Sequence, residues 1–562
     1  MVFTDSQRYL STRGGSYDQS FEDVVLKGLA TDGGLFIPEV VPTLPKNWQK
    51  DWKDFSFQEL AYQIMSLYIS EEEIPSDDLK DIINRSYATF SYDGDDGCRA
   101  VFKMEIMQGL EKGELIADSL IDRDPNVTPL VALDPSKHLY LLELFCGPTF
   151  AFKDVALQFL GNLFEYFLVR RNKDKAENER HHLVVIGATS GDTGSAAIYG
   201  LRGKKDASIF ILHPKGKVSP VQEAQMTTVL DSNVHNIAVE GSFDDCQDMV
   251  KALFADPETN QKYKLAAVNS INWARILAQM TYYVHSIFSL VKAPGYNSSY
   301  PIRVVVPSGN FGDIMAGWFT KKMGLPIQKL IISTNENDIL DRFLRSGSYT
   351  KDSTVGVKET HSPAMDILVS SNFERLLWFI ALKVYGRGSL HEQRATAGAV
   401  VSAWLSDLKN RGGFTVEASI LHAAKADFES QRVSDELTID TIRKIYKTCA
   451  PEGNATQGTR GENGGYILDP HSAVGVAGAL RSMAHHSSKA NYISLATAHP
   501  AKFAAAVDRA LHGEKGYSFE QVTPPEFEGL ETKEKRVILM EAGKDFTGVR
   551  DIIDEKVLGE RS

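Results

Sequence analysis

Residues 147–168, GPTFAFKDVALQFLGNLFEYFL, follow a strand-like run, HLYLLELF at 138–145, and place one lysine at the start of a helical pattern. Apolar residues recur at helical spacing after Lys153, at Ala156, Leu160, Leu163, Phe164 and Phe167. We therefore expect Lys153 at or just before a helix N-terminus. The positive helix end and the flanking Phe150 and Phe152 both disfavour an ammonium ion, which predicts a lowered pKa for the amine.

An amine that is neutral near neutral pH can form an imine with an aldehyde and later act as a base. A lysine at the start of a helix is more often a solvated surface residue than a reactive amine. The prediction that Lys153 forms an imine therefore depends on the other motifs of the chain. A structure that places the Lys153 side chain in solvent, away from the glycine-rich turns, would refute it.

Two further junctions have the same layout of a strand-like run, small residues and a helix. HLVVIGAT at 182–189 leads into SGDTGSAAIYGL, and RVVVP at 303–307 leads into SGNFGDIMAGWF. From about residue 125 onward, β-branched runs alternate with amphipathic helices, which predicts an α/β fold with parallel sheets. Ligands of such folds gather at the carboxyl ends of the strands, where these loops would lie.

The turn PSGNFGD at 307–313 is predicted to hold a phosphate dianion. Its glycines let backbone N–H groups point inward, and the following helix adds a partial positive charge, so no basic side chain is needed. The alternative is a tight strand-to-helix turn without a ligand. The Asp313 carboxylate could compete for the same N–H groups. The predicted phosphate-binding residues are Gly309, Asn310, Phe311 and Gly312.

The loop ATSGDTG at 188–194 offers hydroxyls and helix-start amides to a second anion, although simple N-capping is the alternative. It matches neither GxxxxGK(S/T) nor GxGxxG, which argues against P-loop and dinucleotide-binding folds. Two anion-binding loops favour a phosphorylated cofactor together with an anionic substrate. The residues of this loop are Thr189, Ser190, Gly191, Asp192 and Thr193.

Near the end of the chain, NYISLATAHPAKF at 491–503 indicates a strand followed by a turn. The Thr497 hydroxyl could meet a buried heteroatom, whereas a turn-capping threonine is the commoner case. The histidines His361, His471 and His499 are each more often structural or surface residues than catalysts. Cys146 borders the lysine motif, but a small buried filler is a commoner role for it than a nucleophile.

Composition narrows the class of protein. The 562 residues carry 61 basic and 73 acidic side chains, a formal charge of -12, which argues against a nucleic-acid partner. No apolar run approaches the roughly 18 residues of a membrane span, and the start resembles neither a secretory signal nor a transit peptide, so we expect a cytoplasmic protein. The cysteines form no CxxC pair or zinc cluster, and no metal site is predicted. They are Cys98, Cys146, Cys246 and Cys449.

A chain of this length is expected to fold as several units. We predict an N-terminal unit over 1–120, an α/β core over 121–335, a mainly helical insertion or lid over 336–490, and a C-terminal part of the core over 491–562. The last stretch is expected to contain one strand and a closing helix.

Together, GPTFAFKD, ATSGDTG, PSGNFGD and ATAHPAKF resemble the corresponding motifs of the threonine synthases, pyridoxal-phosphate (PLP) enzymes of fold type II. The opening YLSTRGG and TDGGLFIPE are similar to the N-terminal domain of that family, and the resemblance spans nearly the whole chain, particularly to the long fungal and bacterial branch. It implies a tryptophan synthase β-like fold with two parallel-sheet lobes, an N-terminal α/β domain and a helical insertion.

The resemblance also implies a role for each motif. Lys153 would hold PLP as a Schiff base, residues 309–312 would bind its phosphate, and Thr497 would face the pyridine nitrogen. Residues 189–193 would receive the substrate carboxylate. The implied reaction converts O-phosphohomoserine and water to threonine and phosphate in a monomer or homodimer. Candidates for binding the substrate phosphate, each with a structural role as its alternative, are Arg13, Arg375 and Lys502.

Three other functions remain open at the level of the sequence. A threonine synthase-like phospho-lyase would use the same substrate but release 2-oxobutyrate. A serine/threonine dehydratase is disfavoured by the N-terminal STRGG unit, and a non-catalytic metabolite sensor is disfavoured by the intact lysine motif. Product analysis separates the phospho-lyase from the threonine-forming reaction, since only the phospho-lyase would give 2-oxobutyrate without threonine.

Overall fold

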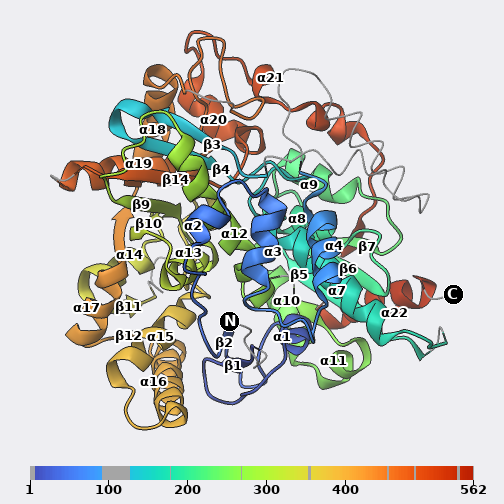
Figure 1. Cartoon of the computed structure of the whole chain (residues 1–562). Coiled ribbons are helices and arrows are strands. Elements are labelled where there is room, and N and C mark those ends of the chain that lie inside the picture. Colours follow the sequence, from blue (N-terminus) through green and yellow to red (C-terminus); the bar gives the residue numbers. More distant parts are fainter. Residues whose placement is uncertain are drawn as a thin grey trace.

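The computed structural model (Figure 1) describes residues 7–90, 127–176, 179–267, 269–351, 356–451, 455–486, 489–540 and 545–560. The predicted boundary at residue 120, like Cys98, lies outside these ranges. Within them, no helix is both long and apolar enough to cross a membrane.

The larger sheet has six strands in the order β13-β10-β9-β14-β4-β3. All neighbours are parallel except the edge pair β3 and β4. Since β9, β14 and β4 are adjacent and parallel, their carboxyl ends meet at one edge of the sheet, as predicted. The strands are β3 (Leu130–Asp134), β4 (Leu139–Glu143), β9 (Ile302–Pro307), β10 (Ile327–Thr334), β13 (Phe428–Arg432) and β14 (Asn491–Ala496).

The second sheet has five parallel strands in the order β15-β7-β6-β5-β8. They are β5 (Leu183–Ala188), β6 (Ala207–Pro214), β7 (Val234–Val239), β8 (Ala266–Ala267) and β15 (Ile538–Met540). The chain therefore returns to this lobe at its end, where α22 (Phe546–Glu560) packs on α10 (Phe243–Ala255). The predicted terminal strand and helix are both confirmed, and the fold is the expected pair of parallel-sheet lobes.

The two lobes share a central layer of helices (Figure 1). The helix α7 (Lys153–Arg171) contacts both α8 (Asp192–Leu201) and α12 (Trp273–Lys292), which in turn contacts α13 (Gly312–Met323). The side chains of α7 are buried around most of its circumference, more than its apolar spacing alone predicted. Gly161 lies against the backbone of Gly200 on α8, where a Cβ atom would collide with a carbonyl, so glycine is what allows these helices to approach.

The N-terminal unit packs on the same helical layer. A small antiparallel sheet of β1 (Tyr9–Ser11) and β2 (Phe36–Pro38) is accompanied by α1 (Phe21–Lys27), α2 (Trp48–Asp51), α3 (Phe57–Met65) and α4 (Ser76–Tyr87). A capping box between Ser56 and Glu59 starts α3. Helix α3 contacts α12 and α4 contacts α7, which joins this unit to the core.

The described residues of the segment 336–490 are mainly helical. They contain α14 (Ile339–Ser346), α15 (Phe373–Tyr385), α16 (Leu390–Asn410), α17 (Ala418–Asp427), α18 (Asp435–Thr448) and α19 (Pro470–His485). Two short strands, β11 (Ser348–Thr350) and β12 (Gly413–Thr415), form an antiparallel pair although α15 and α16 separate them in the chain. Strand β13 from this segment pairs with β10, so part of the segment completes the larger sheet. The exact domain boundaries stay predictions.

Candidate active site

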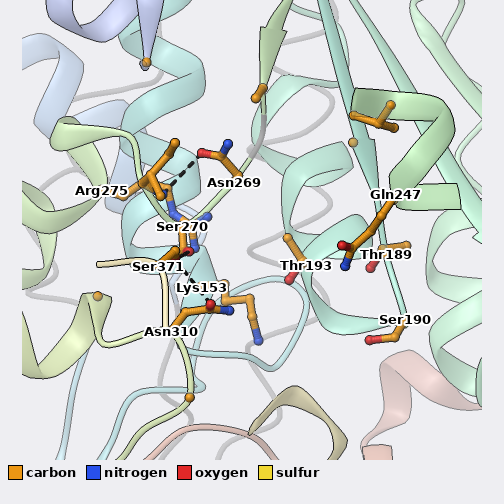
Figure 2. Close-up of a pocket in the computed structure, with 18 of the residues that line it drawn as sticks. Lys153, Thr189, Ser190, Thr193, Gln247, Asn269, Ser270, Arg275, Asn310 and Ser371 are labelled. Atoms are coloured by element: carbon orange, nitrogen blue, oxygen red, sulfur yellow. Dashed lines mark hydrogen bonds between the residues drawn. The ribbon is translucent and has the colours of Figure 1, made fainter. Parts of the chain in front are cut away.

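A cavity of about 1900 Å³ lies where the loops of the two lobes meet, and it gathers the motifs singled out in the sequence. Figure 2 shows Lys153 between two groups of polar side chains, with Thr189, Ser190 and Thr193 on one side and Asn310 on the other. Of the predicted site residues, all of which the structure describes, only Gly191 does not line the cavity. Those that do are Lys153, Thr189, Ser190, Asp192, Thr193, Gly309, Asn310, Phe311, Gly312 and Thr497.

Lys153 begins α7, and its side chain is 10% exposed, so the outcome that would have refuted the prediction is not observed. Burial is the largest influence on its amine and lowers the pKa. The Asp192 carboxylate, with Oδ2 3.7 Å from Nζ, opposes this effect, whereas the positive charges of Lys502 and Arg275 add to it. The result is a buried amine with a pKa below its ordinary value.

The turn before Lys153 is fixed by contacts to the end of β14. Phe152 N–H donates to the carbonyl of Thr497 (2.9 Å), and His499 N–H donates to the carbonyl of Phe150 (3.1 Å). Phe150 has a φ of 60°, a left-handed conformation that is uncommon for a bulky residue and that these contacts stabilise. Lys153 and Thr497 therefore occupy set positions relative to each other.

Asp154, the second residue of α7, stabilises the same turn through hydrogen bonds to Thr149. Its carboxylate accepts hydrogen bonds from the N–H (2.8 Å) and the hydroxyl (2.7 Å) of Thr149. Burial raises the pKa of Asp154 to about 6 although both hydrogen bonds favour the carboxylate.

The glycine-rich turn after β9 presents its backbone to the cavity. Within the described part of the chain, the N–H groups of Gly309, Asn310 and Phe311 donate no hydrogen bond. Their carbonyls are held instead, since the Ser370 hydroxyl donates to Gly309 O (2.6 Å) and the Asn372 amide donates to Asn310 O (2.9 Å). A row of available N–H groups at the start of α13 fits the phosphate of PLP.

The Asp313 carboxylate does not compete for these N–H groups. Its Oδ1 atom instead accepts hydrogen bonds from the hydroxyls of Tyr282 (2.6 Å) and Tyr283 (2.8 Å) on α12. Burial nevertheless raises the pKa of Asp313 to about 6. The conflict expected from the sequence is resolved by two tyrosines that the motif itself does not reveal.

The loop between β5 and α8 is organised by Thr189. Its hydroxyl accepts hydrogen bonds from the N–H groups of Gly191 (3.0 Å) and Gly194 (2.9 Å) and donates to the Gly191 carbonyl (3.1 Å). The Thr189 hydroxyl is thus occupied within the loop. The alternative considered for Ser190, Asp192 and Thr193 was N-capping, but the N-cap residue of α8 is Gly191 and no side chain caps this helix. Ser190 is exposed at the cavity surface, and Thr193 also lines it.

Sequence reasoning missed the polar group on the other side of Lys153. Arg275, near the start of α12, is 4% exposed and lines the cavity, yet its Nε and Nη1 atoms have no hydrogen-bond partner among the described residues. Burial lowers its pKa to about 10. Asn269, Ser270 and Ser371 lie beside it (Figure 2). The stretch NSINWAR at 269–275 shows only a helix start, because Asn272 caps α12, and no sequence pattern indicates the face toward the cavity.

The arginines considered for the substrate phosphate lie outside the cavity wall. Arg13 binds both carboxylate oxygens of Glu374 (3.0 and 2.9 Å), and this pair joins the N-terminal unit to α15. Arg375 is fully buried and donates to the carbonyls of Phe36 and Ile271. Both have the structural role given as the alternative, because these acceptors occupy their guanidinium groups.

The three histidines differ in position. Only His471 lines the cavity, where its Nε2 accepts from Ala364 N–H (3.2 Å) and its Nδ1 faces Asp469 (2.8 Å). His499 contacts the carbonyl of Gln457, and His361 contacts Arg509. In the part of the chain that the structure describes, no group of His, Cys, Asp or Glu side chains is suited to hold a metal ion.

Three family models match the chain: threonine synthase N terminus over residues 8–87, pyridoxal-phosphate dependent enzyme over 121–419, and threonine synthase C-terminal over 472–553. The threonine synthase of Schizosaccharomyces pombe is 52% identical over 99% of both chains. The crystal structure of the yeast threonine synthase superposes with a TM-score of 0.85 at 50% identity, covering 99% of both chains.

A crystal structure of PLP-bound threonine synthase from Brucella melitensis superposes with a TM-score of 0.78 at 35% identity, covering 98% of this chain and 99% of that one. The similarity extends over both lobes and the N-terminal unit, and it agrees with a cavity that brings a buried lysine together with a glycine-rich turn. The chain belongs to the threonine synthase family of pyridoxal-phosphate-dependent enzymes.

Proposed function

We propose that the cavity binds O-phosphohomoserine beside PLP and forms threonine and phosphate with the addition of one water molecule. The observation that carries the proposal is the buried Lys153 amine, whose pKa is lowered, between two loops that begin helices. Membership of the threonine synthase family supports the same reaction.

Three parts of the chain would hold the cofactor. The free N–H groups of residues 309–311 and the start of α13 would bind its phosphate, and Lys153 would form the covalent bond. Thr497 lines the cavity, and its backbone carbonyl accepts a hydrogen bond from Phe152 N–H; its hydroxyl would face the pyridine nitrogen as a neutral partner. When bound, PLP supplies an electron sink for negative charge that develops on the substrate carbons.

The two polar sides of the cavity would orient the substrate. The amides of Ser190, Asp192 and Thr193 at the start of α8, with the Thr193 hydroxyl, would receive the carboxylate. The unpartnered Arg275 guanidinium, with Asn269 and Ser270, would receive the phosphate at the other end. Lys153 lies between these two sides (Figure 2), so a substrate that spans them would present its carbon chain to the amine.

Lys153 would then move the protons. Once released from the cofactor, its neutral amine can take one proton at a time. It would take the Cα proton and pass it on before it takes the Cβ proton, then return one proton to Cγ after phosphate departs and one to Cα after water has added at Cβ. Asp192, at 3.7 Å, would stabilise the amine while it carries a proton. The turn at 363–366 and residues 367–369 line the cavity. They would limit the entry of water until phosphate has left and water can add at Cβ.

Incubation of the purified protein with O-phosphohomoserine, with phosphate and threonine measured together, tests the proposal. We expect equal amounts of both products. Phosphate with 2-oxobutyrate and no threonine would instead identify a phospho-lyase, and the absence of both turnover and a visible cofactor band would indicate a sensor. A monomeric or homodimeric state and a cytoplasmic location also stay predictions.

A further inference from the structure

Lys502 is a fully buried lysine to which the proposed reaction assigns no role. It lies in the short 3₁₀ helix Pro500–Phe503 that follows Thr497, and its side chain is 0% exposed. Its amine contacts Asp192 Oδ1 (2.8 Å) and donates to the carbonyl of Thr149 (2.7 Å). It does not line the cavity, so it is unsuited to the role of phosphate ligand for which the sequence made it a candidate.

Asp192 is shared unequally between two lysines. Its Oδ1 atom receives Lys502 and the side-chain amide of Gln222 (2.8 Å), whereas Oδ2 faces the Lys153 amine at the longer distance of 3.7 Å. The short contacts to Lys502 and Gln222 therefore fix the orientation of the carboxylate. The contact to Lys153 is longer than an ordinary charge-assisted hydrogen bond.

A buried carboxylate next to a single lysine would form a close ion pair and keep that lysine protonated. A second cation on the same carboxylate weakens this effect in two ways. It holds the carboxylate in place, and its own charge repels a proton on Lys153. The charges that face Lys153 are those of Asp192, Lys502, Arg275 and Asp154, while Asp192 also faces His471.

We propose that Lys502 is a positioning residue that holds Asp192 through a direct ion pair and so prevents this carboxylate from fixing Lys153 as an ammonium ion. The inference rests on the proposed function only in requiring that the Lys153 amine react with an aldehyde. The lowered pKa of Lys153 agrees with it, because Lys502 contributes to that direction while Asp192 opposes it.

The test uses the full chain stripped of PLP. The rate at which the apoprotein captures added PLP, followed by the absorbance of the lysine-bound cofactor, is measured against pH. Replacing Lys502 by Met is expected to move the midpoint of this profile upward by about one pH unit or more, because one repulsive charge is lost and Asp192 is released toward Lys153.

A matched control is Lys204→Met, which removes another largely buried lysine that is paired with Glu165 (3.4 Å) and does not line the cavity. It is expected to lower stability without moving the midpoint. If Lys502→Met also leaves the midpoint unchanged, or moves it downward, Lys502 has a purely structural role and the inference is wrong.

Two further variants keep the test decisive if Lys502→Met does not fold. Asp192→Asn removes the carboxylate that Lys502 is proposed to hold and is expected to lower the midpoint. Adding Lys502→Met to Asp192→Asn is expected to raise the midpoint by less than about one pH unit, because only the direct repulsion between Lys502 and Lys153 is then lost. An upward shift of about one pH unit or more between these two variants would show that Lys502 acts without Asp192 and would overturn the inference. The measurement of PLP capture contains no O-phosphohomoserine, so its result does not depend on whether the protein forms threonine. A failure to form threonine in the separate activity assay would count against the proposed function alone.

Discussion

Lys153 shows which properties of a single residue can be predicted from its neighbours in the sequence. The start of a helix and the flanking phenylalanines predicted the direction of its pKa correctly. The largest cause is burial, however, and the charges that adjust the pKa, on Asp192, Lys502 and Arg275, belong to other elements. Such contacts depend on the folded arrangement, so the sequence motif alone could not reveal them.

Replacing Lys153 by Ala removes the amine that is proposed both to bind PLP and to move protons. We expect formation of threonine to fall by at least about a thousandfold, because general acid–base and covalent contributions are lost together. The visible band of the lysine-bound cofactor should also disappear. Lys204→Ala provides a control, and a band that persists in Lys153→Ala without added amine would contradict the assignment.

Asp313 gives a prediction for pH, because burial raises its pKa from 3.8 to about 6. A carboxyl group whose pKa is raised in the folded state stabilises the fold below its unfolded pKa, and this stabilisation is lost as pH rises through about 6. Asp313→Asn removes the titration. Between about pH 4 and about pH 7, the free energy of unfolding of the wild type should therefore fall by about 2–3 kcal/mol relative to the variant.

Chemical denaturation of both proteins at the two pH values measures this difference. Tyr282→Phe serves as a second test, since its hydroxyl favours the ionised form and its removal should raise the pKa of Asp313 further. A constant difference between the Asp313→Asn variant and the wild type across this pH range would show that Asp313 does not titrate as expected.

At the scale of elements, the sequence predicted the strand-to-helix junctions because small residues and helical spacing are local features. Helices α7, α8 and α13 all begin where the motifs indicated. The strand β13 was missed within a mainly helical segment, because FESQR at 428–432 lacks a strong strand pattern and gains its structure by pairing with β10. Tertiary pairing thus decides elements that local sequence leaves undecided.

The close fit of the glycine-rich turn can be tested with one methyl group. A Cβ atom on Gly309 would lie 3.0 Å from Met365 Cα and 3.3 Å from Ala364 O, so the neighbouring turn would have to shift. Gly309→Ala is expected to weaken PLP binding by about tenfold, or roughly 1.4 kcal/mol, in a titration of the apoprotein. Gly559→Ala, where a Cβ atom meets nothing within 4 Å, is the matched control, and equal affinities would show that the turn does not contact the cofactor.

At the scale of the whole molecule, the cavity exists because two sheets direct their loops toward it. The turn after β9 and Thr497 after β14 come from the larger sheet, whereas residues 189–193 follow β5 of the smaller one. The order of the motifs along the chain does not predict which other residues line the cavity between the motifs. Arg275 was missed for this reason, and Arg13 was considered although its guanidinium is occupied by Glu374.

These two arginines should respond in opposite ways to replacement by Met. Arg13→Met breaks a pair in which Glu374 is largely buried but Arg13 is 31% exposed, so we expect a loss of about 1–2 kcal/mol in the free energy of unfolding, discounted for solvent screening, and little change in kcat/KM. Arg275→Met removes a buried, unpartnered charge and should leave stability equal or higher.

The Arg275 variant should nevertheless lower kcat/KM for O-phosphohomoserine by about a hundredfold, because hydrogen bonds to a charged group contribute about 1.5–3 kcal/mol each. Thermal unfolding and steady-state kinetics on both variants measure the two effects. If Arg275→Met retains full kcat/KM while Arg13→Met loses it, the substrate phosphate binds on the side of the N-terminal unit, and the proposed orientation of the substrate across Lys153 is wrong.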